Sequence, residues 1–352
     1  MKKINWTYAL TSLLTLIMVA FLLLYPMDYY IMKPGSAYNV EEFVTVQQGD
    51  RDDTGSLNLM TVSMSRATPF KYIVAKFRDY QDILDMNDVR QEEEDDEEYN
   101  IRQLKLMSDS KFNALYVAFS RANLDYHVTY KGVYVLNIIS GGAADGILKP
   151  GDEIVEIDGA RIQNQQMLID EIGNRQSEDK ISLVINRDDK LLTKTIALKE
   201  IPGSQGKKGL GITFNESKTI KTDPKVNMDT EDIGGPSAGL MFTLEILNQL
   251  VDEDLTKGYT VAGTGEMYEN GTVGRIGGVE KKVVAAHEDG MEIFFAPDDE
   301  ITDAMLKMNP NILSNYEAAV LTAKKIGTKM KIVPVKTIDD ALDYLAQLQP
   351  KN

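Results

Sequence analysis

The sequence predicts an α+β chain behind an apolar N-terminal helix, and three observations support this fold class. The chain opens with a long apolar run that carries no charge. Its middle third alternates short β-branched runs with glycine turns, which is typical of small sheets. Its last third mixes helical periodicities with short strand-like runs, so helices and strands are expected to pack together. With 352 residues, the chain has room for one anchor and two compact domains.

The composition excludes several functions before any motif is considered. A net charge of −16 argues against sequence-independent binding of nucleic acid, which requires clustered lysine and arginine. The chain has no cysteine, which excludes disulfides, thiolate nucleophiles and cysteine-based zinc sites. Its two histidines, His127 and His287, lie far apart and form no HExxH pair. We therefore expect no zinc hydrolase, and no metal or other cofactor.

The N-terminal apolar run is predicted to be a transmembrane anchor over residues 8–27, with the lipid bilayer as its partner. None of these residues is charged, and a helix of this length crosses a hydrocarbon core of roughly 30 Å. Two lysines precede the run and Asp28 follows it, so the positive-inside bias places residues 1–7 in the cytoplasm and the remainder outside the cell membrane. A cleaved signal peptide is the rival interpretation, but the run is unusually long and no small-x-small site follows it closely.

Residues 28–117 are expected to form an extracytoplasmic N-terminal segment that contains a strongly acidic stretch. Residues 92–98 are seven consecutive acidic side chains, and such a run repels itself, so we expect a solvated loop over residues 91–99. A calcium site is the alternative, but the run lacks the spaced ligands and the turn glycine of a calcium-binding loop. After it, apolar residues near a spacing of 3.6 predict a helix from Met107 to Asn123.

The next region carries the first family resemblance. Residues 141–159 read GGAADGILKPGDEIVEIDG, which resembles the L-x-x-G-D-x-I-x-x-I-x-G pattern of protease-associated bacterial PDZ domains, so a PDZ domain is expected over residues 118–200. The resemblance implies a groove between a strand and a helix, where an extended peptide adds as a strand. A groove that the chain itself fills, and that only positions domains, is the alternative. The loop expected to receive the peptide end comprises Lys131, Gly132, Val133 and Tyr134.

A serine with small neighbours marks the candidate chemistry. Ser237 stands in GPSAG, residues 235–239, before a stretch in which leucines recur at the spacing of an amphipathic helix. Small neighbours leave room for a substrate carbonyl, and the start of a helix supplies N–H groups and a positive dipole end for an oxyanion. Two acids just upstream, Glu231 and Asp232, are expected to serve the helix dipole rather than catalysis.

The same string fits G-x-S-x-G, so an α/β-hydrolase is an alternative. That fold requires a strand directly before the serine and a later histidine in a loop. No clear strand precedes Ser237, and the histidine that follows it, His287, falls within a predicted helix. A base other than histidine is then required. A lysine can serve if burial or nearby positive charge lowers its pKa.

Three motifs in order resemble the Lon protease domain. They are GPSAG at residues 235–239, TGE at residues 264–266, and IGG at residues 276–278, with Lys282 four positions after the last glycine. The resemblance extends over about residues 206–350, and we set the limits of the catalytic domain at residues 201–352.

The resemblance also assigns roles to individual residues. It implies that Ser237 is the nucleophile, Lys282 the general base, and Thr264 a hydrogen-bond partner that orients the lysine. Gly235 and Pro236 are expected to support the serine. The side chain of the neighbouring Lys281 is rotated by about 100° around the helix axis from that of Lys282, and Lys281 is expected to be a surface charge.

The chain departs from Lon enzymes proper in two respects. It contains no G-x-x-x-x-G-K-[ST] string, so we expect no ATP, and Gly234 stands where Lon proper has an acid. The order of anchor, acidic segment, PDZ and Lon-like domain is similar to the PDZ-containing Lon-like proteases of Gram-positive bacteria. This implies an ATP-independent serine endopeptidase for exported peptides or unfolded proteins, with processing of a secreted signalling peptide as a narrower role. The alternative is a non-catalytic membrane-tethered PDZ scaffold; the oligomeric state stays open.

Overall fold

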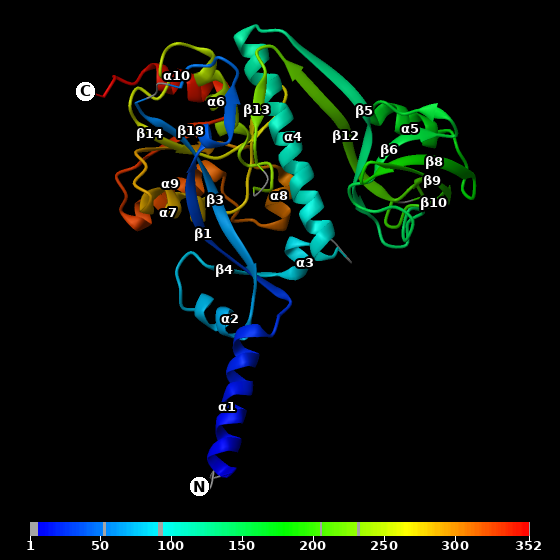
Figure 1. Cartoon of the computed structure of the whole chain (residues 1–352), viewed down its shortest axis with the longest axis horizontal. Coiled ribbons are helices and arrows are strands. Elements are labelled where there is room, and N and C mark those ends of the chain that lie inside the picture. The colour runs from blue at the N-terminus through cyan, green and yellow to red at the C-terminus, as the bar shows by residue number, and fades with distance from the viewer. Residues whose placement is uncertain (1–5, 52–53, 91–93, 205, 231–232, 352) are drawn as a thin grey trace, which may run out of the picture.

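The computed structural model describes residues 6–51, 54–90, 94–204, 206–230 and 233–351. A helix at the N-terminus leads into a body of mixed sheet and helices, and a β-rich unit projects from that body on two long paired strands (Figure 1). This mixed content confirms the predicted α+β class.

The N-terminal helix α1 spans Trp6–Leu24, and none of its side chains is buried. It is long and apolar enough to cross a membrane, and a signal sequence would meet the same criteria. The predicted anchor over residues 8–27 thus overlaps one helix that ends at Leu24. Of the predicted tail over residues 1–7, residues 1–5 lie outside the described part of the chain, and the other two are already helical.

The body is built on a six-stranded sheet with the order β18-β17-β14-β3-β1-β4. Strands β3, β14, β17 and β18 run parallel, whereas β1 is antiparallel to both β3 and β4. Half of this sheet therefore comes from the N-terminal segment, and the limits predicted at residues 28–117 and 201–352 divide one sheet. The strands are β1 Tyr29–Asn39, β3 Ser56–Arg66, β4 Asp82–Asp85, β14 Thr260–Gly263, β17 Ile293–Pro297 and β18 Lys331–Val335.

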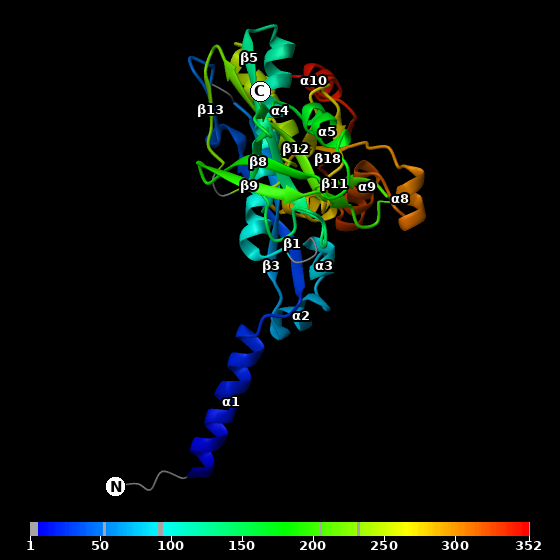
Figure 2. The ribbon, with the colours of Figure 1, turned by 90° about the vertical axis from the view of Figure 1, so that its right-hand side faces the viewer.

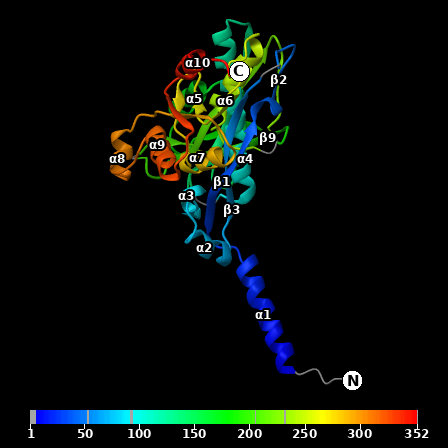
Figure 3. The same cartoon turned by 90° about the vertical axis from the view of Figure 1, so that its left-hand side faces the viewer.

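Helices cover both faces of this sheet. Successive residues of β14 point to opposite faces, so Val261 joins the core around α6 and Ala262 joins the core around α7 and α9. Figures 2 and 3 show this layering from the two sides. Every residue of α6 from Gly239 to Gln249 is buried, so the expectation of an amphipathic helix is wrong: the sheet, α4 and α10 surround it. The covering helices are α6 Gly239–Leu250, α7 Val279–Glu288, α9 Asn315–Ile326 and α10 Ile338–Ala346.

A 27-residue helix, α4 Asp96–Ala122, packs against α6 and runs between the body and the β-rich unit (Figure 1). It corrects the predicted solvated loop over residues 91–99. Asp95 caps the helix in a capping box with Glu98, and acidic side chains in a first turn face the positive end of the helix dipole. Glu94 is buried and takes two hydrogen bonds from Arg102, at 2.7 and 2.8 Å. Residues 91–93 lie outside the described part of the chain.

The β-rich unit is a second sheet with the order β12-β5-β6-β8-β9 and with β7 beside β6. Its apolar core lies under helix α5 and the glycine-rich turns. Strand β12 pairs along the whole of β5, so this sheet extends beyond the predicted limit at residue 200. The elements are β5 Tyr126–Ile138, β6 Glu153–Ile157, β7 Ala160–Arg161, α5 Gln165–Gly173, β8 Lys180–Arg187, β9 Lys190–Ala197 and β12 Ile212–Thr222.

Short elements complete the described chain. β2 pairs with β13, and the hairpin β15–β16 turns at Asn270 and Gly271. These elements are η1 Val40–Glu42, β2 Val44–Val46, α2 Pro69–Ala75, α3 Met86–Val89, β10 Lys199–Glu200, β11 Lys208–Gly209, β13 Val226–Met228, β15 Glu266–Met267, β16 Val273–Gly274 and α8 Asp303–Met308.

Candidate active site

Three polar side chains from three elements meet at the start of α6. Ser237 lies in the loop before that helix and is half-buried. Lys282 comes from the first turns of α7, and its Nζ lies 2.7 Å from Ser237 Oγ. Thr264 follows the end of β14, and its Oγ1 lies 2.8 Å from the same Nζ. The structure therefore brings together the serine, lysine and threonine that the sequence singled out.

The lysine is buried, and no carboxylate of the described residues pairs with it. Lys282 is 2% exposed, and burial alone lowers its pKa to about 7, because an apolar surrounding penalises the ammonium form. A buried ammonium without a carboxylate partner is costly, so the neutral amine becomes accessible near neutral pH. This meets the electrostatic requirement for a lysine that accepts a proton.

The threonine directs the lysine through the pattern of its hydrogen bonds. Thr264 is fully buried, and its hydroxyl donates to the backbone carbonyl of Ser237 at 3.1 Å. The hydroxyl can then act only as an acceptor toward Lys282, which donates one N–H to it. The amine thus keeps a lone pair that can face Ser237. The same loop is fixed by the N–H of Gly265, which donates to the Ser237 carbonyl at 2.9 Å.

Helix α4 holds the serine loop from the opposite side. The N–H of Gly235 donates to the carbonyl of Gln103 at 3.1 Å, and Ser110 Oγ donates to the carbonyl of Pro236 at 3.1 Å. Gly235 needs its positive φ of 86° to make this turn. A Cβ on Gly234 would lie 2.9 Å from the Cβ of Gln103. That close approach explains why glycine stands where Lon proper has an acid.

These α4 contacts could not be predicted from the sequence, because no motif marks a polar residue on a helix that packs against a distant loop. A third contact of this kind comes from Asn113, whose side-chain amide donates to the carbonyl of Met267 at 2.8 Å. Glu231 and Asp232, which the sequence assigned to the helix dipole, lie outside the described residues.

Lys281 is not the surface charge that the sequence predicted. It is only 6% exposed and forms an ion pair with Asp82 of β4. The N-terminal segment adds β4 beside β1 at the edge of the sheet, and this edge covers the second face of α7. Sequence periodicity alone could not place a strand from so far upstream on this helix.

Neither histidine takes part in the site. His287 is exposed in the last turn of α7, as expected, and His127 is exposed on β5. In the described residues, the nearest strand before Ser237 is β13, which ends at Met228. The α/β-hydrolase alternative therefore lacks its strand and its histidine. The described residues also contain no cluster of three or more His, Cys, Asp or Glu side chains that could hold a metal ion.

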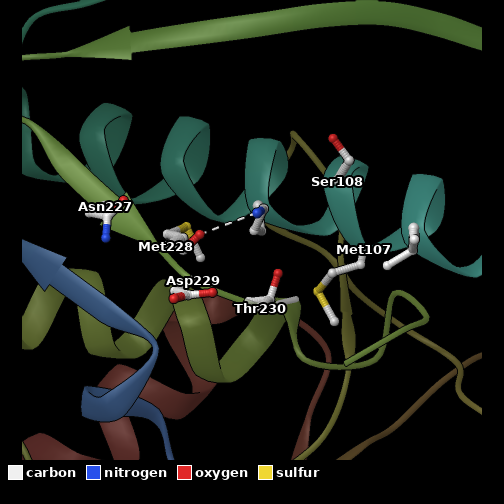
Figure 4. A pocket seen from close by; sticks show the side chains of 8 residues that line it. Met107, Ser108, Asn227, Met228, Asp229 and Thr230 are labelled. Carbon is white, nitrogen blue, oxygen red and sulfur yellow. Dashed lines mark hydrogen bonds between the residues drawn. The ribbon is translucent and has the colours of Figure 1, made fainter. Parts of the chain in front are cut away.

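A cavity of about 380 Å³ lies between α4 and residues 227–230 (Figure 4). Lys111 Nζ donates to the carbonyl of Met228 across it at 3.3 Å. Met107 on its wall shares a helix face with Gln103 and Ser110, which contact the serine loop. The lining residues are Leu104, Met107, Ser108, Lys111, Asn227, Met228, Asp229 and Thr230.

The predicted carboxylate-binding loop Lys131, Gly132, Val133 and Tyr134 is wrong as a loop. These residues lie within β5. Val133 pairs with Glu216 of β12 on one side and with Ile154 of β6 on the other, so both edges of the strand are occupied. A strand that is paired on both sides has no converging N–H groups to offer a peptide end.

The second sheet has two edge strands, β12 and β9, one at each end of the strand order. Helix α5 contacts β12, and the N–H of Gln165 donates to the Glu216 carboxylate at 3.4 Å. An unpaired strand edge next to a helix is the arrangement in which an extended peptide can add.

Comparison with known proteins places both parts of the chain. The Lon protease (S16) C-terminal proteolytic domain matches residues 230–347, and the PDZ domain matches residues 83–198. The Lon proteases of Metamycoplasma arthritidis and Acinetobacter baumannii are 29% and 30% identical over 117 residues, which is 33% of this chain and 12% of each protein. The Lon protease of Rickettsia bellii is 31% identical over 134 residues, 38% of this chain and 15% of that protein. The chain thus spans only a small part of these relatives' length.

Solved structures of two PDZ domains are each similar to about a quarter of the chain. The PDZ domain of the SdrC-like protein from Listeria monocytogenes is 35% identical, over 25% of this chain and 92% of that one, with a TM-score of 0.24. The PDZ domain of the SdrC-like protein from Listeria innocua is also 35% identical, over 24% of this chain and 92% of that one, with a TM-score of 0.23.

Together the two family matches define a protein in which a PDZ domain is combined with a Lon-type proteolytic domain. With its N-terminal apolar helix, the chain is consistent with a PDZ-containing Lon-like protease, so the resemblance seen in the three motifs is confirmed at this level.

Proposed function

We propose that the chain is an ATP-independent serine endopeptidase in which Ser237 is the nucleophile and Lys282 the general base. One observation carries the proposal: a buried lysine, with a pKa lowered by burial to about 7, lies 2.7 Å from a half-buried serine hydroxyl. Lowering the pKa of a lysine by desolvation is a known way to obtain a base that activates a hydroxyl. The Lon-type proteolytic domain over residues 230–347 supports the serine protease class.

The reaction can be written with these residues alone. Neutral Lys282 takes the proton of Ser237 as the serine oxygen attacks the substrate carbonyl, and the resulting ammonium gives that proton to the leaving amine. In the described residues no acceptor takes the backbone N–H of Ser237 or Ala238, so both can donate to the oxyanion. Water then enters, Lys282 removes its proton, and hydrolysis of the ester releases the acid and restores the serine.

Substrate recognition is proposed to use both domains. PDZ and protease domains support binding of peptides or proteins. In this proposal an extended peptide adds to the open edge of β12 beside α5, and unfolded or short segments reach Ser237 without an unfoldase. The cavity between α4 and residues 227–230 then receives a substrate side chain next to the reacting bond.

The site of action is proposed to be the outer face of the cell membrane. In this arrangement α1 stays in the chain as a single membrane span, the N-terminus lies in the cytoplasm, and the catalytic body faces outward. Exported peptides are then the substrates, with a secreted signalling peptide as the narrowest candidate. Comparison of the peptides released by cells with the wild-type chain and with Ser237→Ala would identify them.

The decisive test is on the full chain in detergent micelles. We expect the wild-type chain to cleave casein or an unstructured fluorogenic peptide and to react with a serine-directed fluorophosphonate probe, and we expect Ser237→Ala to do neither. If the wild-type chain neither cleaves nor reacts, the non-catalytic PDZ scaffold becomes the better description. If Ser237→Ala still cleaves, the nucleophile has been misassigned.

A further inference from the structure

The short helix α2, Pro69–Ala75, turns an apolar stripe away from the body. Phe70, Ile73 and Phe77 are 52%, 53% and 86% exposed. Phe70 and Ile73 are three residues apart and share one face of α2, and Phe77 lies in the turn that continues the helix, where its N–H donates to the carbonyl of Val74 at 3.1 Å. A contiguous set of large exposed apolar side chains marks a surface that binds something.

The orientation of α2 is fixed by contacts on its other face. Ala75 is buried against Ile31 and Ala67, and the ring of Tyr72 lies 5.2 Å from that of Tyr29. Thr68 caps the helix, so its first turn is defined. The apolar stripe therefore faces outward because the opposite face is packed, and turning it inward would break this small core.

Three exposed basic residues accompany the stripe: Lys71 in the helix, Lys76 at its C-cap and Arg78 just after it. Lys71 Nζ donates to Ser65 Oγ at 3.3 Å, and Lys76 Nζ lies 4.8 Å from the centroid of the Tyr72 ring, on the exposed surface in both cases. An apolar stripe with exposed basic residues beside it is the pattern of a helix that lies in a membrane interface, where lysine and arginine meet anionic headgroups. This local charge opposes the net charge of −16 of the whole chain.

The stripe is continuous with the end of α1. α2 contacts α1, and all three overall views place it at the end of the body nearest that helix (Figures 1, 2 and 3). The N–H of Met27 donates to the carbonyl of Ala67 at 2.9 Å, and the N–H of Ala67 donates to the carbonyl of Tyr29 at 2.8 Å. These bonds fix the start of α2 against the residues that follow α1.

We propose that α2 lies in the headgroup region of the bilayer that α1 crosses. Phe70, Ile73 and Phe77 enter the acyl boundary, and Lys71 and Lys76 bind anionic headgroups. The inference rests on the membrane anchoring in the proposed function. It adds a second attachment point, which holds the body in one orientation instead of leaving it free to swing on α1.

The test uses the full chain in proteoliposomes and one tryptophan as a depth reporter. The chain has one tryptophan, so Trp6→Phe provides a silent background for Phe77→Trp. We expect lipids brominated on the acyl chain to quench this reporter at least about twofold. The matched control is Leu191→Trp on β9 of the PDZ unit, a position 71% exposed, which should not be quenched.

The outcomes separate this inference from the anchoring itself. An alkaline carbonate wash that removes the chain from vesicles overturns both, because α1 would then not span the bilayer. A chain that resists the wash but whose reporter is quenched no more than the Leu191→Trp control overturns the docking of α2 alone. Emission that shifts with protein concentration, without quenching, assigns the stripe to a second copy instead. Cleavage of a soluble peptide is measured in parallel and is expected to stay unchanged.

A second variant tests the contribution of Lys71 and Lys76. We expect the double variant Lys71→Gln and Lys76→Gln, made in the reporter background, to lose quenching in vesicles with anionic lipid more than in vesicles with zwitterionic lipid, because removing two charges removes the attraction to anionic headgroups. An equal loss in both vesicle types would show that the lysines do not contact the lipid.

Discussion

The two faces of helix α7 carry adjacent lysines in opposite electrostatic surroundings. Lys281 is 6% exposed and is paired with the carboxylate of Asp82. Lys282 is 2% exposed, and its side-chain partners among the described residues are the hydroxyls of Ser237 and Thr264. Burial is nearly the same at both positions, so burial alone does not distinguish them. The chemistry of the partner does, because a carboxylate stabilises the ammonium whereas hydroxyls leave room for the neutral amine.

The largest expected effect contrasts the two lysines in catalysis. We expect Lys282→Met to lower kcat by at least about 10⁴-fold, because removal of a base that acts as a unit with its nucleophile removes most of the rate enhancement. Lys281→Met keeps nearly the same volume and is expected to retain kcat within about tenfold. Steady-state cleavage of an unstructured peptide measures both. Equal losses in the two variants would contradict the assignment of the base.

The Lys282→Met and Lys281→Met variants should also differ in their free energy of unfolding, and the pKa of Lys282 determines the direction of the change for Lys282→Met. An unfolded lysine titrates near 10.5 and the folded Lys282 near 7, so between these values the unfolded state binds more protons and stability rises with pH. The wild type therefore bears the full penalty below about pH 7. We expect Lys282→Met to be more stable by a few kcal/mol at pH 6, less the hydrogen bonds that it loses.

The measurement is thermal unfolding by circular dichroism in detergent at several pH values. The advantage of Lys282→Met should shrink steadily from pH 7 toward pH 10. Lys281→Met is the matched control, and it should be destabilised at pH 6, because it leaves the carboxylate of Asp82 without its partner. An advantage of Lys282→Met that stays constant with pH would mean that the buried amine is charged in the folded protein.

The pH profile of activity is the next expected effect. Because the neutral form of Lys282 is the base and burial lowers its pKa to about 7, kcat/KM should rise about tenfold per pH unit below 7 and level off above it. Measurement with a substrate that has no ionisable group near the scissile bond isolates this titration. A profile that is flat from pH 5.5 to pH 9 would exclude lysine as the titrating base.

The sequence singled out Ser237, Thr264 and Lys282, which lie together in the structure, because the motifs that contain them are local. Three short glycine-containing strings mark the ends of elements, and the turn residues in them determine where α6, β14 and α7 begin or end. Each string thus fixes a backbone position next to Ser237, Thr264 or Lys282. The PDZ pattern is local in the same way, since it describes one turn, one strand and the next turn.

What the sequence did not predict depends on contacts between distant segments. Asp82 reaches Lys281 across 199 positions, and the pairing of β12 with β5 fills the edge that was expected to bind a peptide. Composition predicts a loop for the acidic run because like charges repel one another. It does not reveal that the dipole of α4 stabilises acidic residues in the first turn, or that Arg102 pairs with the buried Glu94. Pairing partners of this kind have no sequence period.

The smallest predicted effect tests one of these unpredicted contacts, between α4 and the serine loop. Ser110 is 1% exposed, and its Oγ donates to the carbonyl of Pro236, the residue before Ser237. Loss of one such bond costs about 1 kcal/mol, so we expect Ser110→Ala to lower kcat roughly three- to tenfold through misplacement of the nucleophile, with KM little changed. Ser120→Ala, on the exposed end of the same helix, is the control. If Ser110→Ala lowers only the melting temperature and leaves kcat unchanged, α4 supports the fold but does not position Ser237.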